Sequence, residues 1–505
     1  MGVLVGGCGG GDGGGSSELA SFAPPDAPLF GEGVIRPEGD QREAIESFAE
    51  RVGGISDPGA AVIAAFDDSI GQDTPGVTYA EDIEPWLGDH AAFFVSSFEM
   101  GADGGSTDAA GIVEVDDAAA AREFIPQGFG EDAEPEQRSY AGADYYFDPE
   151  GELAVGVIDD EVLVVGTETA FKVAVDASQG ESLAESEEYT DRVDALPDDP
   201  LGSIFFEPAA AVQAAIASEG LDPDQARLIK PLLGGPLSQP VAVTLTADSD
   251  SAAIDIATTI DGGDDLSSES SLLTDLPAGS WFAAAVPNLG PTLERTLDQL
   301  SSSGLPGAGM LERQVREAVG IDLSDDVFSW LGDAAVFVEG TAAPAFSAGL
   351  IAQTSDPEAP RALVDALQAL AEQQSGLPSS GPPEGADYGF SIGLPGVGGG
   401  AEAGVIGGEL VVVLGATAAQ ALDPSETLGD DEAFQAAVSS LGDDLAPVLY
   451  VDLPLFFQVA EQGSDGDIDY DAARPYFDDF ATLVSGSHVE DGLMHSRVSV
   501  SLADE

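Results

Sequence analysis

The sequence predicts an α+β fold built from two tandem, pseudo-symmetric copies of one domain, each a mixed, mainly antiparallel sheet with packed helices. The main observation is a repeated motif. Residues 86–93 read Trp-Leu-Gly-Asp-His-Ala-Ala-Phe, and residues 330–337 read Trp-Leu-Gly-Asp-Ala-Ala-Val-Phe. The offset is 330 − 86 = 244 in a chain of 505 residues. A period this long is a whole domain with its own core, because solenoid repeats are much shorter.

Weaker matches extend the repeat through both halves. They pair Pro25, Phe30 and Val34 with Pro277, Phe282 and Val286, residues 142–145 with 385–388, residues 156–158 with 404–406, and Asp224 and Arg227 with Asp471 and Arg474. The resulting domain plan is an N-terminal segment over 1–20, a first repeat over 21–262, a linker over 263–275 and a second repeat over 276–505.

Secondary-structure signals within the first repeat predict hairpins separated by helices. In order, they predict a strand over 30–35, a helix over 42–52, strands over 91–98 and 111–115, a hairpin of 155–158 and 162–165, a helix over 209–218, and a closing hairpin of 241–246 and 254–260. The second half repeats this order and ends in a hairpin that turns at Glu490-Asp491-Gly492. Period-2 runs joined by Asp- and Gly-rich turns favour antiparallel pairing.

The chain is strongly acidic. It has 93 acidic and 15 basic residues, a formal charge of −78, and yet 43% hydrophobic residues. This composition predicts a folded core under an anionic surface rather than a disordered polyelectrolyte. Nucleic acid and anionic lipid surfaces are poor direct partners for such a chain, because binding them relies on Lys and Arg, and we predict no nucleic-acid partner. The acidity is typical of a halophile or a proteome-wide bias, or else serves to recruit cations or a basic partner.

Cys8 is the only cysteine, and residues 4–8, Leu-Val-Gly-Gly-Cys, are similar to a bacterial lipobox. A Gly- and Ser-rich tether follows it over 9–17. Only seven residues precede Cys8, so a basic start and a full apolar region are missing, and we expect a true start codon further upstream. We therefore expect lipidation of Cys8, with a cytosolic protein as the alternative. No apolar run reaches the ~20 residues that a transmembrane helix needs.

Two sets of residues are candidate metal ligands. Asp465, Asp467 and Asp469 alternate as in calcium loops, but Tyr470 and Tyr476 occupy the positions where an EF-hand needs Gly and an acidic residue. The simpler interpretation is helix N-terminal caps. His488 and His495 should pair directly across the Asp491-Gly492 turn, which would place two imidazoles on one sheet face. An exposed polar pair is the simpler interpretation there. We predict no cofactor, with Ca²⁺ or another divalent cation as the alternative.

No catalytic motif is present. The Gly-rich residues 396–401 precede a strand rather than open a helix, so they are interpreted as a loop. The repeated motif is interpreted as structural, which assigns the same roles to its residues in both halves. The Trp packs under the sheet, the Gly permits a tight turn, and the Asp bonds backbone in that turn. These residues are Trp86, Gly88 and Asp89 in the first half and Trp330, Gly332 and Asp333 in the second.

Taken together, the Leu-Pro-Ala opening at 276–278, the Trp-Leu-Gly-Asp turn, the Gly-Ala-Asp-Tyr segment and the Thr-rich closing hairpin resemble a known bacterial family. This is the family catalogued as domain of unknown function 3352, found largely in actinobacteria. The resemblance spans residue 21 to the C-terminus. It implies an extracytoplasmic or membrane-associated protein of uncharacterised role, and it implies no active-site residues.

The leading functional hypothesis is a non-enzymatic lipoprotein on the outer face of the cytoplasmic membrane. It would bind a ligand or a protein partner, in a cleft between the two halves. One alternative is a metal-dependent hydrolase that uses carboxylates with His488 and His495. The other is a soluble cytosolic acidic protein of a halophile.

Overall fold

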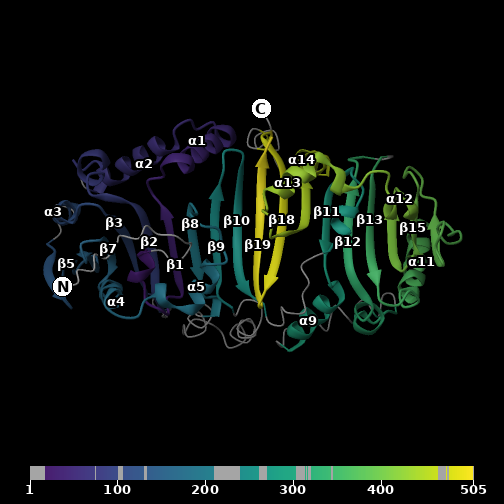
Figure 1. The fold of residues 1–505 in the computed structure, drawn as a ribbon, viewed down its shortest axis with the longest axis horizontal. Helices are drawn as coiled ribbons and strands as arrows, with labels where there is room; N and C mark the ends of the chain where they lie inside the picture. Colours follow the sequence, from purple (N-terminus) through teal and green to yellow (C-terminus); the bar gives the residue numbers. More distant parts are fainter. Residues whose placement is uncertain are drawn as a thin grey trace, which may run out of the picture.

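One large antiparallel sheet organises the molecule (Figure 1). The computed structural model describes residues 18–73, 76–99, 106–129, 134–209, 239–260, 270–302, 313, 316, 320–342, 345–463, 474 and 477–503. Within these residues nineteen strands join into a single sheet, and helices pack on it. The prediction of helices packed on a mainly antiparallel sheet is therefore confirmed.

The strands of the first half lie side by side in the spatial order β4 (Glu136–Tyr140), β5 (Ala143–Asp148), β6 (Leu153–Ile158), β7 (Val162–Thr167), β3 (Ser106–Val115), β2 (Leu87–Glu99), β1 (Leu29–Val34), β8 (Gly202–Phe206), β9 (Val241–Ala247) and β10 (Ser251–Thr259). The sheet then continues through β19 (Leu493–Leu502), β18 (Phe480–Glu490), β17 (Ala446–Asp452), β11 (Ser280–Val286), β12 (Leu331–Glu339), β13 (Ser347–Thr354), β16 (Glu409–Leu414), β15 (Ala401–Ile406) and β14 (Tyr388–Ile392).

The described helices of the first half are η1 (Glu18–Phe22), α1 (Gly39–Gly53), α2 (Pro58–Asp73), η2 (Tyr79–Ile83), α3 (Ala118–Gly128), α4 (Glu168–Ser178), η3 (Leu183–Glu185) and α5 (Glu187–Val193). Those of the second half are α8 (Leu272–Asp275), α9 (Leu289–Ser302), η7 (Ser324–Phe328), α11 (Arg361–Ser375), α12 (Ala418–Leu422), η8 (Leu428–Asp430), α13 (Glu432–Ser439) and α14 (Leu453–Gly463). The helix expected over 209–218 lies outside the described residues apart from its first position.

The two halves meet in the middle of the sheet. β10 pairs with β19 in register from Ser251↔Ser501 to Thr259↔Leu493, although about 240 residues separate them in the sequence. Figure 1 shows these strands side by side at the centre. We expected each half to hold a sheet of its own. That expectation is wrong, because the backbone hydrogen bonds of this pairing continue one sheet from the first half into the second.

Local turn chemistry was predicted correctly at two of the hairpins that the sequence singled out. Asp159 and Asp160 adopt positive φ angles of 53° and 64° between β6 and β7, and Asp491 and Gly492 adopt 50° and 82° between β18 and β19. Asp, Asn and Gly tolerate this backbone region best, so such residues fix where a strand reverses.

Buried residues form clusters on both faces of the sheet. In β6, Ala154 and Ile158 belong to a cluster covered by α4 and α5, whereas Val155 and Val157 belong to one covered by α3. Alternate residues of a strand point to opposite faces, so both faces are apolar here. The second half has the same arrangement, with one cluster under α12 and α13 and the other under α11.

Two of the sequence matches do not hold in space. Tyr145 packs with Phe171 of α4, while Tyr388 lies in the cluster of Trp330 and α11, on the other face. Phe30 is likewise in the core under α5, but its match Phe282 is not among the buried residues of the equivalent core. A one-residue difference in loop length moves a side chain to the opposite face of a strand.

The boundaries expected from the sequence also shift. Leu19 and Ala20, placed in the N-terminal segment over 1–20, are buried in the first core. Leu272 and Leu273, placed in the linker over 263–275, are buried in the second core. Both pairs are apolar residues beside polar or Gly-rich runs, and their packing assigns them to the neighbouring core.

Candidate functional site

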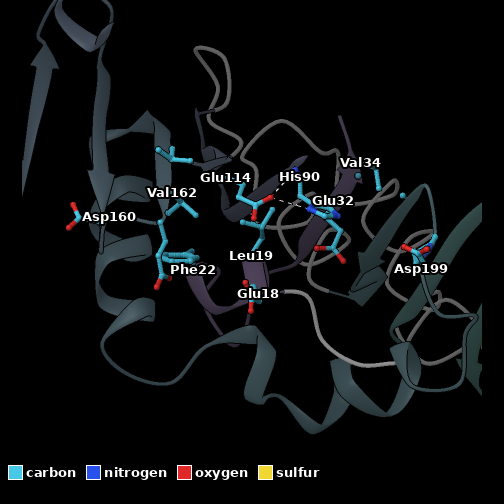
Figure 2. A pocket seen from close by; sticks show the side chains of 15 residues that line it. Glu18, Leu19, Phe22, Glu32, Val34, His90, Glu114, Asp160, Val162 and Asp199 are labelled. Carbon is cyan, nitrogen blue, oxygen red and sulfur yellow. Dashed lines mark hydrogen bonds and ion pairs between the residues drawn. The ribbon is translucent and has the colours of Figure 1, made fainter. Parts of the chain in front are cut away.

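A cavity of about 470 Å³ opens where five neighbouring strands of the first half begin or end (Figure 2). β1 and β3 end there, and β2, β7 and β8 begin there, because antiparallel neighbours alternate in direction. The lining comes from η1, from these strand ends and from the turns beside them: Glu18, Leu19, Phe22, Glu32, Gly33, Val34, His90, Glu114, Val115, Asp160, Glu161, Val162, Asp199, Pro200 and Gly202. The volume is typical of a pocket for a small molecule.

The charges of this acidic pocket are almost all negative. Its titratable lining residues are Glu18, Glu32, Glu114, Asp160, Glu161, Asp199 and His90. None of the described lining residues is a Lys or an Arg. Six carboxylates in one concavity with low-dielectric walls focus a negative potential, which raises the local concentration of cations.

Glu114 is the carboxylate that the backbone positions most firmly. Its Oε2 accepts hydrogen bonds from the backbone N–H of Asp89 at 3.1 Å and of His90 at 3.0 Å, and it lies 3.1 Å from Nδ1 of His90. Figure 2 shows the imidazole and the carboxylate turned toward each other. With one oxygen occupied by these donors, Oε1 of Glu114 remains the atom that can accept from a ligand.

Gly88 allows this close approach. A Cβ on Gly88 would lie 2.6 Å from Cγ of Glu114, closer than real Cβ contacts. The glycine of the repeated motif is therefore needed for packing against the side chain of Glu114. Neither it nor Gly332 has a positive φ, and both lie inside strands, so the predicted tight turn is wrong.

The floor of the pocket is kept open by two glycines. Gly33 of β1 pairs directly with Gly202 of β8, and both line the cavity. A Cβ on Gly202 would lie 3.1 Å from the carbonyl oxygen of Glu32. Larger residues at this pair would fill the cavity or push the strands apart.

Two other carboxylates of the pocket have partners at its rim. Asp160 forms an ion pair with Arg122 of α3, which is not a lining residue. Ser203 donates its hydroxyl to Oε1 of Glu32 at 3.2 Å. These contacts hold the side chains in place and leave the pocket with a strong excess of negative charge.

Within the described part of the chain, no group of three or more His, Cys, Asp or Glu side chains is arranged to hold a metal ion. The alternative of a metal-dependent hydrolase therefore has no support among those residues.

The structure buries both motif tryptophans. Trp86 and Trp330 are each 4% exposed. Trp86 donates its indole N–H to the carbonyl of Asp82 at 2.7 Å, and Trp330 donates to that of Asp326 at 2.5 Å. Each tryptophan follows a short π-helix and belongs to a buried cluster of its own half, so both are core residues.

The aspartates of the repeated motif contact different groups in the two halves. Asp333 Oδ1 accepts from the backbone N–H of Asn288 at 2.9 Å, which is a contact with backbone 45 residues away rather than in the turn beside the motif. Asp89 instead faces Arg36, with 4.0 Å between Oδ1 and Nε, and its carbonyl accepts from the backbone of Ile35.

His488 and His495 are directly opposite each other in the β18–β19 register, as predicted. The ring of His495 is committed elsewhere, since its Nε2 lies 2.7 Å from Oδ1 of the buried Asp255. These histidines are far from the acidic pocket in the sheet order and do not line it. Asp465, Asp467 and Asp469, the candidate calcium ligands, and Cys8 lie outside the described residues.

The expected cleft between the two halves is not where this pocket lies. β10 and β19 are hydrogen-bonded neighbours, and the pocket lies within the first half, where β9 separates its nearest strand, β8, from β10. The sequence did carry one signal for the pocket: His90 is the first position at which residues 86–93 and 330–337 differ. No described helix is long and apolar enough to cross a membrane.

Residues 64–463 match the family model described as "Protein of unknown function (DUF3352)". No curated protein matches the chain. Two solved structures are similar to it, described as "Structure of crystal form I of TP0453" and "Structure of crystal form IV of TP0453". Both are 10% identical and cover 80% of this chain, with 95% and 94% of their own chains covered and TM-scores of 0.18 and 0.17. Likeness at such TM-scores carries no argument about fold or function.

Proposed function

Since the chain belongs to the DUF3352 family, whose description assigns no activity, we propose a function from the site itself. The protein is a non-enzymatic, lipid-anchored binding protein on the outer face of the cytoplasmic membrane, and its acidic pocket holds a small organic cation. The observation that carries the proposal is a 470 Å³ cavity with six carboxylates and no described Lys or Arg in its lining.

The lining favours an amine-bearing molecule over a bare metal ion. Beside the acids, the pocket presents the apolar side chains of Leu19, Phe22, Val34, Val115 and Val162. Pockets of this mixed kind bury the apolar body of a ligand and orient it with a few polar contacts. An alkyl chain with one or more ammonium groups matches both features.

The proposal includes a tandem duplication, which the strand order supports. Counted from the outer edge, the order β5-β6-β7-β3-β2-β1-β8-β9-β10 in the first half corresponds to β14-β15-β16-β13-β12-β11-β17-β18-β19 in the second. The order along the chain agrees as well. When the strands of each half are numbered in chain order, with the additional strand β4 left out, each strand has the same number as its counterpart in the other half.

If the halves are copies, the second lacks Glu114 and His90 of the pocket. Leu87 pairs with Val115, and Leu331 pairs with Thr354, so the counterpart of Glu114 is Gln353. The counterpart of His90 is Ala334. In the β6–β7 turn, Asp160 corresponds to Gly408, whereas Glu161 matches Glu409 and is an acid in both halves. We place the function at the pocket of the first half, because Glu114 and His90 are present in that copy alone.

A binding assay tests the pocket. We expect isothermal titration calorimetry with spermidine to show one site per chain at low salt, weakening as sodium chloride is added. Glu114→Gln, which installs the residue of the other half, should weaken binding about fivefold or more, since one partly screened ion pair contributes about 1 kcal/mol.

Two matched variants control for non-specific attraction. Gln353→Glu adds a carboxylate at the equivalent place of the second half, and Glu432→Gln removes an exposed charge on α13. Neither should change the affinity by more than the error. Equal weakening by Glu114→Gln and Glu432→Gln would mean that spermidine binds the acidic surface in general.

The lipid anchor has a separate test. The proposal places a diacyl group on Cys8, ahead of the Gly- and Ser-rich residues 9–17. Mass spectrometry of the membrane fraction from cells that express the gene at its native locus should show an acylated N-terminal peptide. Cys8→Ser should move the protein to the soluble fraction, and an unmodified Cys8 in the native protein would contradict the anchor.

A further inference from the structure

Helix α2 carries an apolar surface that is largely exposed. Its first nine residues, 58–66, read Pro-Gly-Ala-Ala-Val-Ile-Ala-Ala-Phe and hold no charge. Residues 59–66 are all exposed. Val62 is 68% exposed, Phe66 41%, Ile63 37%, and Ile55 just before the helix 46%. A helical segment that is apolar on all sides is normally buried, so the first half of α2 lacks the contact for which its sequence is suited, although Asp67, Asp68 and Asp73 follow it in the second half.

The middle of α2 is fixed to the rest of the fold. Phe66 forms an edge-to-face contact with Tyr79 of η2, with ring centroids 6.1 Å apart. The backbone N–H of Tyr79 donates to Oδ1 of Asp67 at 2.7 Å. These contacts orient α2, and they leave Val62 and Ile63 facing outward.

The apolar helix and the N-terminal tether belong to the same end of the sheet. α1 follows β1 by a few residues, and its Gln41 donates to the carbonyl of Asp199 beside the acidic pocket. Glu18, the first described residue, lines that pocket together with Val34. In Figure 1, α1 and α2 lie along one end of the strands of the first half.

The length of chain before Glu18 sets how far a lipid on Cys8 can be from this end. The separation is 18 − 8 = 10 residues. Fully extended, that span covers at most about 35 Å. A lipid anchor on Cys8 would thus hold the end of the molecule that carries α2 close to the bilayer.

We propose that α2 is a membrane-docking helix. Its residues Val62, Ile63 and Phe66, together with Ile55 just before the helix, enter the headgroup and acyl boundary of the bilayer. The inference rests on the proposed lipid anchor for its orientation. α2 has no Lys or Arg, and the whole chain has a charge of −78, so the contact depends on apolar burial and is opposed by anionic lipid. A basic amphipathic helix would show the opposite dependence on lipid charge.

Vesicle flotation of the full chain with Cys8→Ser tests this contact without any acyl group. We expect the protein to float with phosphatidylcholine vesicles at 0.15 M sodium chloride. Vesicles with an equal share of phosphatidylglycerol should bind it at least threefold more weakly. The double change Val62→Ser and Ile63→Ser should lower binding to phosphatidylcholine at least fivefold.

Leu370→Ser is the matched control, because Leu370 is 38% exposed on α11 of the other half. It should leave binding unchanged, and circular dichroism melts should show that both variants are folded. As a second readout, Val62→Trp should give a blue-shifted emission with vesicles, since the native Trp86, Trp281 and Trp330 are all buried already.

Several results would overturn the inference. One is a Cys8→Ser protein that never floats. Another is an equal loss of binding in the Leu370→Ser control. A third is a self-association, measured by analytical ultracentrifugation, that disappears in the Val62→Ser and Ile63→Ser protein, because a second copy would then cover α2. The anchor is judged independently by the acylation of Cys8, so unacylated native protein that still binds vesicles through α2 would contradict the anchor alone.

Discussion

Arg497 of β19 donates its Nε to Oδ1 of Asp255 of β10 at 2.8 Å, across the pairing that joins the two halves of the sheet. The carboxylate is completely buried. Nε2 of His495 lies 2.7 Å from the same oxygen, and Nη1 of Arg497 also donates to the carbonyl of Leu441 at 3.2 Å. A residue of the first half is thus held by two residues of the second.

Arg497→Met should destabilise the protein by about 3–5 kcal/mol, because it leaves the carboxylate of Asp255 buried without its main partner. Arg42→Met is the control, since Arg42 forms an exposed pair with Glu46 at 3.2 Å on α1 and should cost about 0.5 kcal/mol or less. Urea denaturation followed by circular dichroism measures both. Similar losses for the two variants would mean that the pair at the junction of the halves is not special.

Trp86→Phe and Trp330→Phe should cost similar amounts, about 1–3 kcal/mol each. Each change removes an indole N–H that donates to the carbonyl four residues earlier and leaves a small cavity around a 4% exposed ring. The costs should add in the double variant, because the two sites share no partners. A neutral effect at one site would show that the two tryptophans have different structural roles.

The sequence predicted the features that depend on interactions between neighbouring residues, and it missed those that depend on residues far apart in the chain. Turns depend on local chemistry, so Asp159, Asp160, Asp491 and Gly492 predicted their hairpins correctly, and the last pair also gave the His488–His495 register. The junction of β10 with β19 depends on residues about 240 positions apart, and no local pattern specifies it.

The candidate site was missed for a related reason. Its acids come from η1 and from the ends of β1, β3, β7 and β8, which the sequence could not order. In a chain with 93 acidic residues, no carboxylate such as Glu114 stands out by type. Only the contrast between His90 and Ala334 inside the repeated motif indicated where the halves differ.

Glu168 should make stability depend on acid pH. Nζ of Lys172 and the hydroxyl of Tyr145 contact its Oε1 at 2.9 and 2.7 Å, and Nη1 of Arg138 contacts Oε2 at 2.9 Å. The hydrogen bonds from Lys172, then Tyr145 and Arg138, lower the pKa of Glu168 from 4.5 to about 2 against the opposing effect of burial. A lowered pKa stabilises the folded state above the unfolded value, and this stabilisation is lost as the pH falls through the folded value.

Glu168→Gln should therefore be less stable than the native protein at pH 7, by on the order of 1 kcal/mol after solvent screening. The difference should shrink as the pH falls from about 4.5 toward 2, where the native carboxyl becomes protonated. Chemical denaturation at a series of pH values measures it. Glu432→Gln should show no such convergence, and a Glu168→Gln difference that stays constant with pH would contradict the lowered pKa.

Stability should rise with salt, because folding brings carboxylates closer together than they are in the extended chain. The charge of −78 has few basic residues to offset it, and repulsion opposes compaction. Raising the ionic strength from 0.01 to 1 M shortens the Debye length from about 30 to about 3 Å and should raise the thermal midpoint. Lowering the pH toward ~4 should at first act the same way by neutralising carboxylates.

Specific calcium sites would differ, since micromolar calcium would stabilise at constant ionic strength where sodium chloride would not. Thermal melts in each salt separate the two causes, and a midpoint indifferent to both would mean that the carboxylates are spaced widely enough not to oppose folding.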